Sequence, residues 1–201
     1  MKKPGFRFAL LVILLSALPV QFALASVRSV NCDDPKKDNS INAALALLNP
    51  AEPSTLQVSG ACNEVVLVGS FQRLTMIGNP AATIHGQVQV VDSPSFVMRD
   101  ITVTGATGFG FALACAVASS CFLTNVTVEG SFNRGLFVQD RSKATLADGT
   151  IRNNAGPGVW VDSGSELTLL GGSVENNGGS GSWSRTTASS SPALGRASSH
   201  R

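Results

Sequence analysis

Residues 138–160 read VQDRSKATLADGTIRNNAGPGVW, and residues 161–183 read VDSGSELTLLGGSVENNGGSGSW. The two segments have the same length and align without a gap, so that Leu146 matches Leu169. A period of this kind is the signature of stacked structural repeats, because each unit buries its apolar face only against the next one. The stretch therefore predicts a repeat architecture rather than separate domains.

The same spacing continues upstream. A hydroxyl residue followed by an aliphatic one recurs at similar intervals, at Thr83-Ile84, Thr102-Val103, Thr127-Val128, Thr150-Ile151 and Ser173-Val174. Each period contains short runs in which apolar and polar residues alternate, broken by Gly, Asn and Asp, which is typical of strands joined by turns. The sequence therefore predicts about five coils, each built from three short strands.

Stacking of such coils gives an all-β parallel β-helix, in which every strand pairs with the equivalent strands of the coils before and after it. The inward positions are expected at Leu146, Ile151, Val159 and Val161. Five coils at about 4.8 Å each would give a rod of roughly 24 Å.

Residues 26–55 are expected to close the amino-terminal end of this rod, ahead of repeats over residues 56–183. Ser40 is a suitable N-cap for a short helix over residues 41–48, whose apolar residues share one face and which Pro50 would end. A helix in this position would cover the apolar interior at the open end of the first coil and the unpaired edges of its strands.

These features resemble exported bacterial proteins with right-handed parallel β-helix repeats of the pectate-lyase-like kind. The resemblance rests on the amphipathic cap, the turn Gly60-Ala61-Cys62-Asn63-Glu64 and the repeated motif x-L-x-x-x-T-[IV]-x-N-N-x-G, and it covers about residues 30–181. It implies a right-handed coil but leaves the activity open, because such coils carry lyases, hydrolases, epimerases, adhesins and inert stalks alike.

Residues 1–25 have the organisation of a secretory signal peptide: three basic residues, an apolar run over residues 8–18 and the small-x-small site Ala23-Leu24-Ala25. The run is too short to span the roughly 30 Å hydrocarbon core of a bilayer. We therefore expect cleavage after Ala25, a secreted or periplasmic protein, and no membrane association of the mature chain.

All four cysteines follow this segment, as expected of a protein that folds in an oxidising compartment. Three pairings are possible. We favour Cys32–Cys62, which would tie down the amino-terminal cap, and Cys115–Cys121, which would close a short loop. With only two histidines in the chain and no tight thiol cluster, neither a metal site nor another cofactor is expected.

The formal net charge of +2 combines segments of different sign. Residues 26–182 hold nine basic and 13 acidic side chains, a net charge of −4, whereas residues 1–25 and the tail are basic. A mildly acidic repeat domain does not indicate binding to nucleic acid.

The repeat pattern ends after Gly181, and residues 184–201 are rich in serine, with three arginines and no acid. They are interpreted either as a disordered tail or as a segment translated out of frame. In the second interpretation, a shifted frame restores a string that matches residues 135–143 in register, provided that Arg185 has an AGA or AGG codon. The natural β-helix would then be longer than this chain.

The candidate binding residues lie on one outer face of the predicted rod. Phe137 and Trp160 occupy equivalent positions between inward neighbours, so both are expected to point outward, about 4.8 Å apart. Outward aromatic rings can stack on sugars, and Arg134 and Asp162 lie close enough in the chain to bind hydroxyl groups. The alternative is that the ring pair only shields strand edges or packs under a loop.

Alignment of the coils also places Asp100, Asn125 and Asp148 in one column, with the two carboxylates about 10 Å apart. Such a pair is compatible with glycoside hydrolysis or with a calcium site. Asp and Asn equally favour the turn before each strand, because their side chains bond to local backbone groups. We prefer this structural interpretation.

Two further columns are predicted to be structural. Glu129, Arg152 and Glu175 would form a ladder of opposite charges on successive coils. The pairs Asn153-Asn154 and Asn176-Asn177 would stack their amides along the rod.

The sequence thus predicts an exported, non-catalytic β-helix module that binds a polysaccharide or cell-surface glycan or serves as a structural repeat. The alternative is a fragment of a polysaccharide lyase or glycoside hydrolase that would use Asp100 and Asp148. An uncovered last coil would also permit edge-to-edge self-association.

Overall fold

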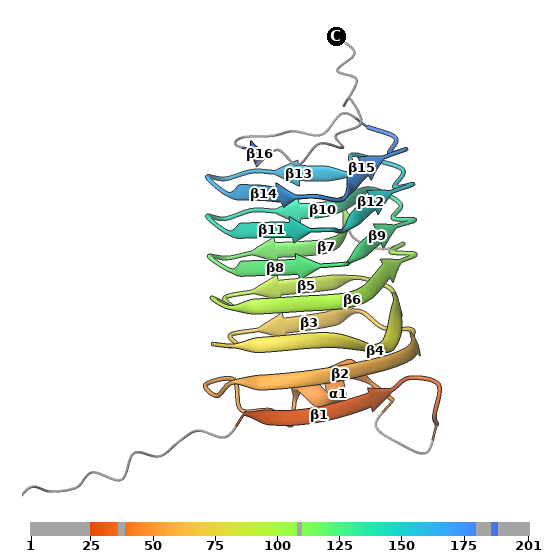
Figure 1. Cartoon of the computed structure of the whole chain (residues 1–201), viewed down its shortest axis with the longest axis vertical. Helices are drawn as coiled ribbons and strands as arrows, with labels where there is room; N and C mark the ends of the chain where they lie inside the picture. Colours follow the sequence, from red (N-terminus) through yellow and green to blue (C-terminus); the bar gives the residue numbers. More distant parts are fainter. Residues whose placement is uncertain (1–24, 36–38, 108–109, 180–185, 189–201) are drawn as a thin grey trace, which may run out of the picture.

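The computed structural model describes residues 25–35, 39–107, 110–179 and 186–188. Residues 1–24 of the predicted signal peptide and most of the predicted tail therefore lie outside the described residues. Within them, the chain winds into a rod of stacked parallel strands (Figure 1). This is a parallel β-helix of about five coils, as the repeat period predicted.

One face of the rod is a large parallel sheet, which has eleven strands in the described part of the chain. Eight of them follow one another along the rod: β1 (Ser26–Asn31), β2 (Ser54–Cys62), β4 (Leu74–His85), β6 (Phe96–Thr104), β8 (Ser120–Thr124), β11 (Lys143–Ala147), β14 (Glu166–Leu170) and β16 (Thr186–Ala188). The other three continue the later coils after a bend: β9 (Thr127–Glu129), β12 (Thr150–Arg152) and β15 (Ser173–Glu175).

A second face is a small parallel sheet with five strands among the described residues: β3 (Val66–Gly69), β5 (Val88–Val91), β7 (Phe111–Ala116), β10 (Arg134–Val138) and β13 (Val159–Val161). Later coils thus have the three predicted strands, for example β8, β9 and β10. In the earlier coils, β2, β4 and β6 each run through the bend as one long strand.

The strand register stacks the core side chains in columns. The predicted inward residues Leu146, Ile151, Val159 and Val161 are confirmed, since none is more than 2% exposed. The apolar and polar alternation of the strands is therefore the alternation between core and surface. Along the large sheet, one fully buried column runs through Leu56, Met76, Met98, Leu123 and Leu146.

The amino-terminal cap contains the helix α1 (Ile41–Leu45), which packs against β1, β2 and β3. Ser40 is its N-cap, and its hydroxyl accepts from the N–H of Ala43 at 3.2 Å. The helix ends earlier than the predicted residue 48, because the backbone tightens to i→i+3 bonds, with the N–H of Leu48 donating to Leu45 at 3.1 Å. Leu48 is nevertheless buried, as predicted.

Strand β1 lies within the predicted cap and was not expected from the sequence. It pairs in parallel with β2 along its whole length and extends the large sheet below the first coil. Only Val30 of this strand is buried, so its apolar pattern is weak. A strand with one buried residue can be recognised only once its partner is known.

Both predicted disulfides are confirmed. Cys32–Cys62 joins the ends of β1 and β2, with the Cα atoms 5.0 Å apart. Cys115–Cys121 closes the turn between β7 and β8, with a Cα separation of 6.3 Å. Two such bonds are typical of an oxidising compartment. No helix in the described ranges has the length and apolar character needed to cross a membrane.

One part of the predicted tail is described. Thr186–Ala188 forms β16, which pairs in parallel with β14 at the carboxyl end of the large sheet. The sequence predicted no strand in this segment. The rest of residues 184–201 lies outside the described residues.

Candidate functional site

Phe137 and Trp160 lie side by side on the outer face of the small sheet. They are opposite each other in the register of β10 and β13, and each stands between two buried neighbours, so that strand alternation turns both rings outward. Both side chains are half-buried. Phe111 extends the group, since its ring centroid is 5.8 Å from that of Phe137.

Arg134 lies on these rings. Its guanidinium carbon is 4.7 Å from the centroid of the Trp160 ring and 5.2 Å from that of Phe137, the geometry of a cation–π interaction. Its Nη1 donates to the Gly110 carbonyl at 3.5 Å, while the buried Nε has no hydrogen-bond partner among the described residues. The sequence predicted that Arg134 lies near the rings, and the structure shows it stacked on both. Its binding to sugar hydroxyls stays a prediction. Phe111, Arg134, Phe137 and Trp160 are called the aromatic cluster below.

Asp162 occupies a turn next to this cluster. Its carboxylate accepts from the backbone N–H of Ser163 at 2.6 Å, and its side chain is exposed. Ser163 has a φ of 53° and Gly164 a φ of 72°, so the local bond supports a left-handed turn. In the described ranges, Asp162 makes no ion pair with Arg134.

Asp100, Asn125 and Asp148 form the predicted column at the bend of the large sheet. All three have left-handed backbones, with φ values of 55°, 51° and 52°, which Asp and Asn adopt more easily than other residues with a side chain. The Asn125 amide donates to the Asp100 carboxylate at 2.7 Å. These observations favour the interpretation as bend residues over a free pair of catalytic carboxylates.

The charge ladder has the predicted geometry. Arg152 lies in register between Glu129 and Glu175, and its Nε donates to the Glu129 carboxylate at 2.8 Å. This hydrogen bond and the charge of Glu129, with a smaller contribution from Glu175, raise the pKa of Arg152 above its ordinary value. Arg152 therefore stays charged and paired, which suits a structural role.

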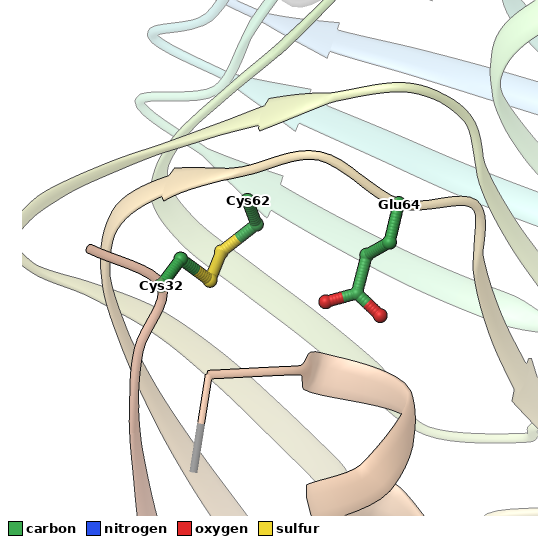
Figure 2. Close-up of side chains that lie close together, drawn as sticks. All are labelled: Cys32, Cys62 and Glu64. Atoms are coloured by element: carbon green, nitrogen blue, oxygen red, sulfur yellow. A yellow bond between two sulfur atoms is a disulfide. The ribbon is translucent and has the colours of Figure 1, made fainter. Parts of the chain in front are cut away.

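Three potential metal ligands, from Cys32, Cys62 and Glu64, lie within 4.8 Å of one another (Figure 2). The two sulfurs are joined in a disulfide and so are not thiolate ligands. The Glu64 carboxylate accepts from the backbone N–H groups of Ile41 at 2.6 Å and Asn42 at 3.1 Å. The group is therefore a structural clamp of the amino-terminal cap.

An open groove of about 560 Å³ lies over the turns that lead from β9, β12 and β15 toward the small sheet, and it was not predicted. It is called the turn groove below. Phe132 lines it with a side chain that is 76% exposed, next to the exposed amides of Asn153 and Asn176. The buried side chain of Asn154 lies beneath them. The sequence signals for this site were the two repeated Asn-Asn pairs, which were interpreted as structural, and a phenylalanine within a Gly-Ser-Phe-Asn turn.

The comparison with protein families agrees with this architecture. A family model described as the right handed beta helix region matches residues 54–194. Neither the search of curated proteins nor the search of solved structures gave a match. The predicted handedness is thus confirmed, whereas the pectate-lyase-like character and bacterial export stay predictions.

Proposed function

Because the chain belongs to the right-handed β-helix family, we propose that it is an exported, non-catalytic repeat module that binds glycans through the aromatic cluster. The observation that carries this proposal is a platform of three aromatic side chains and one arginine on the outer face of a sheet. Membership of the family does not by itself determine an activity, because function depends on the binding or catalytic site that a fold carries.

The aromatic cluster offers both kinds of contact that a sugar needs. The apolar C–H face of a sugar ring stacks on Phe and Trp rings, which bury a large area in one contact. Arg134 carries five N–H donors, of which Nη1 contributes one to the Gly110 carbonyl. The Nε–H is buried, so the remaining Nη N–H groups are the ones that can donate to hydroxyl or carboxylate oxygens of the same sugar. A guanidinium on the platform favours acidic sugars over neutral ones.

Export is part of the proposal. The two disulfides suit an oxidising compartment, and the signal-peptide pattern of residues 1–25 agrees with them. A glycan-binding module outside the cytoplasm would meet polysaccharides and cell-surface glycans directly.

Binding can be measured with a glycan array and by titration calorimetry on the hits. Trp160→Ala should weaken binding of an acidic polysaccharide at least about tenfold, since a buried aromatic anchor carries much of such an interface. Phe122→Ala is the control, because Phe122 is an exposed aromatic residue of β8 in the large sheet, away from the aromatic cluster. Equal affinity of Trp160→Ala and the unchanged protein would remove the aromatic cluster as the binding site.

The enzymatic alternative has its own test. Hydrolysis of a glycosidic bond uses two carboxylates roughly 5–10 Å apart on either side of one sugar. We expect no unsaturated product and no new reducing ends when the protein is incubated with uronate polymers and neutral polysaccharides. Product formation that disappears in Asp100→Asn would replace the binding proposal with a polysaccharide lyase or hydrolase.

A further inference from the structure

The turn groove stands on a rigid, internally bonded layer. Asn154, only 2% exposed, accepts from the N–H of Ser131 at 3.0 Å and donates to the amide oxygen of Asn177 at 2.9 Å. Asn177 in turn donates to the carbonyl of Ile151 at 3.1 Å. The predicted amide ladder is thus confirmed for Asn154 and Asn177, whose polar groups bond within the rod, but not for Asn153 and Asn176.

A second pair of amides in the groove has the opposite character. Asn153 and Asn176 are exposed, and their side chains make no hydrogen bond in the described part of the chain. They follow the paired residues Arg152 and Glu175, so they lie on successive coils about 4.8 Å apart. Each primary amide offers two N–H donors and one acceptor oxygen, so the two residues present a repeated set of hydrogen-bonding groups along the groove.

Phe132 adds an apolar surface to these amides. It is the most exposed large apolar side chain of the described residues, at 76%. Its backbone is nevertheless anchored, because its N–H donates to the carbonyl of Ala106 in the preceding coil at 3.0 Å. An exposed ring on an anchored turn, beside a groove, is suited to stacking on a flat apolar face.

The groove also lacks charge. None of its lining residues has an ionisable side chain, in contrast to the aromatic cluster, where Arg134 lies on the rings. An anionic ligand would therefore find no counter-charge here, whereas the hydroxyls of an uncharged sugar find amide partners. The groove has a volume of about 560 Å³ and is open to solvent.

We propose that the turn groove is a second glycan subsite, and that it takes an uncharged polysaccharide chain. Phe132 stacks on the C–H face of a sugar unit, and Asn153 and Asn176 exchange hydrogen bonds with hydroxyls along the chain. This inference rests on the proposed function, since both sites would serve one glycan-binding module. The turn groove differs from the aromatic cluster in its residues and in the charge of the ligand it would bind.

The experiment measures binding of a soluble neutral glucan, a neutral mannan and a polygalacturonate to the purified protein at low and high salt. Phe132→Ala should weaken binding of a neutral polysaccharide at least about tenfold and leave polygalacturonate binding unchanged. Asn153→Gly should also weaken neutral binding, and it keeps the fold because glycine accepts the φ of 54°. Phe122→Ala is the control, and neutral binding should not depend on salt.

The outcomes separate this inference from the proposed function. Neutral binding that is absent, or unchanged in Phe132→Ala, overturns the turn-groove subsite even if Trp160→Ala loses polygalacturonate binding. Loss of polygalacturonate binding in Phe132→Ala, at an unchanged melting temperature, overturns the assignment to uncharged chains. If Phe132→Ala loses neutral binding and Trp160→Ala has no effect on either polymer, the turn-groove subsite is supported and glycan binding at the aromatic cluster is contradicted.

Discussion

Single serine residues connect successive coils of the rod. At the turn from the small to the large sheet, each buried serine hydroxyl accepts the backbone N–H of the equivalent residue one coil earlier, at 3.0–3.2 Å. Such a hydroxyl replaces the strand partner that a turn cannot provide, and a buried N–H without an acceptor is costly. The accepting residues are Ser93, Ser119, Ser142 and Ser165.

Ser142→Ala should lower the free energy of unfolding by roughly 1–3 kcal/mol, because the buried N–H of Ser119 would lose its acceptor. Urea unfolding followed by circular dichroism measures this change. Ser120→Ala is the control, since Ser120 is exposed at the start of β8, and it should stay within about 0.5 kcal/mol. A wild-type unfolding midpoint for Ser142→Ala would contradict a stabilising serine ladder.

Strand alternation predicts the face from which a side chain leaves, but not the position of the far end of a long side chain or the direction of a turn residue. Alternation places Phe137 and Trp160 outward because successive side chains leave a strand on opposite faces. It says nothing about a long side chain such as Arg134, whose rotamer is decided by the two rings it meets. Phe132 lies in a turn without periodicity, so its exposure could not be derived from the repeat.

At the scale of elements, α1 depends on Glu64, which lies in the connection between β2 and β3. A helix of five residues is too short to persist alone, and its first N–H groups need acceptors. Glu64 accepts from Ile41 and Asn42 N–H groups, and also from the Ser40 hydroxyl at 3.0 Å. One carboxylate thus secures the start of the helix that covers the first coil.

Glu64→Ala should release α1 and lower the free energy of unfolding by roughly 1.5–3 kcal/mol, the usual contribution of hydrogen bonds to a charged group. Hydrogen exchange at residues 41–45 should accelerate before exchange in the later coils does. Glu52→Ala is the matched control, because Glu52 is exposed in the turn before β2. Unchanged exchange of α1 in Glu64→Ala would contradict its role as the helix acceptor.

Elements inside the repeat were more predictable than those at its start. In the later coils, strands recur with a constant period, so each one supports the assignment of the next. β1 pairs with β2 at a wider sequence spacing than the repeats have, so it does not follow the repeat period. It buries only Val30, so it also lacks a clear alternation of apolar and polar residues. The early end of α1 follows from hydrogen bonds near Leu48 that composition does not specify.

For the whole molecule, a stacked rod should tolerate the loss of one complete coil. Residues 143–165 span one period, and Lys143 pairs directly with Glu166 of the next coil. Deletion of this segment should leave a folded rod whose urea m-value falls by about a fifth, because one of about five coils no longer contributes buried surface. Deletion of residues 143–157, which breaks the register, is the control and should prevent folding. A loss of folding in both deletions would contradict independent stacking of the coils.

The two ends of the rod are closed differently. At the amino-terminal end, α1 covers the core, and the Asn42 side chain pairs with the outer edge of β3, accepting from Leu67 at 3.1 Å and donating to Val65 at 2.7 Å. At the carboxyl end of the described rod, Leu169 and Val174 are only partly buried, whereas their equivalents one coil earlier are fully buried.

In the described part of the chain, β16 pairs with the outer edge of β14, whereas β15 pairs only with β12. We therefore expect self-association through the outer edge of β15 and a limit at the dimer, because the covered amino-terminal end cannot propagate a filament. Sedimentation velocity at rising protein concentration should show a monomer–dimer equilibrium. Val174→Lys should shift it to the monomer, since a charge would be desolvated at the contact. Val65→Lys alters an exposed valine at the opposite end and should leave the equilibrium unchanged. A monomer at every concentration, or equal loss of dimer in both variants, would contradict association through the last coil.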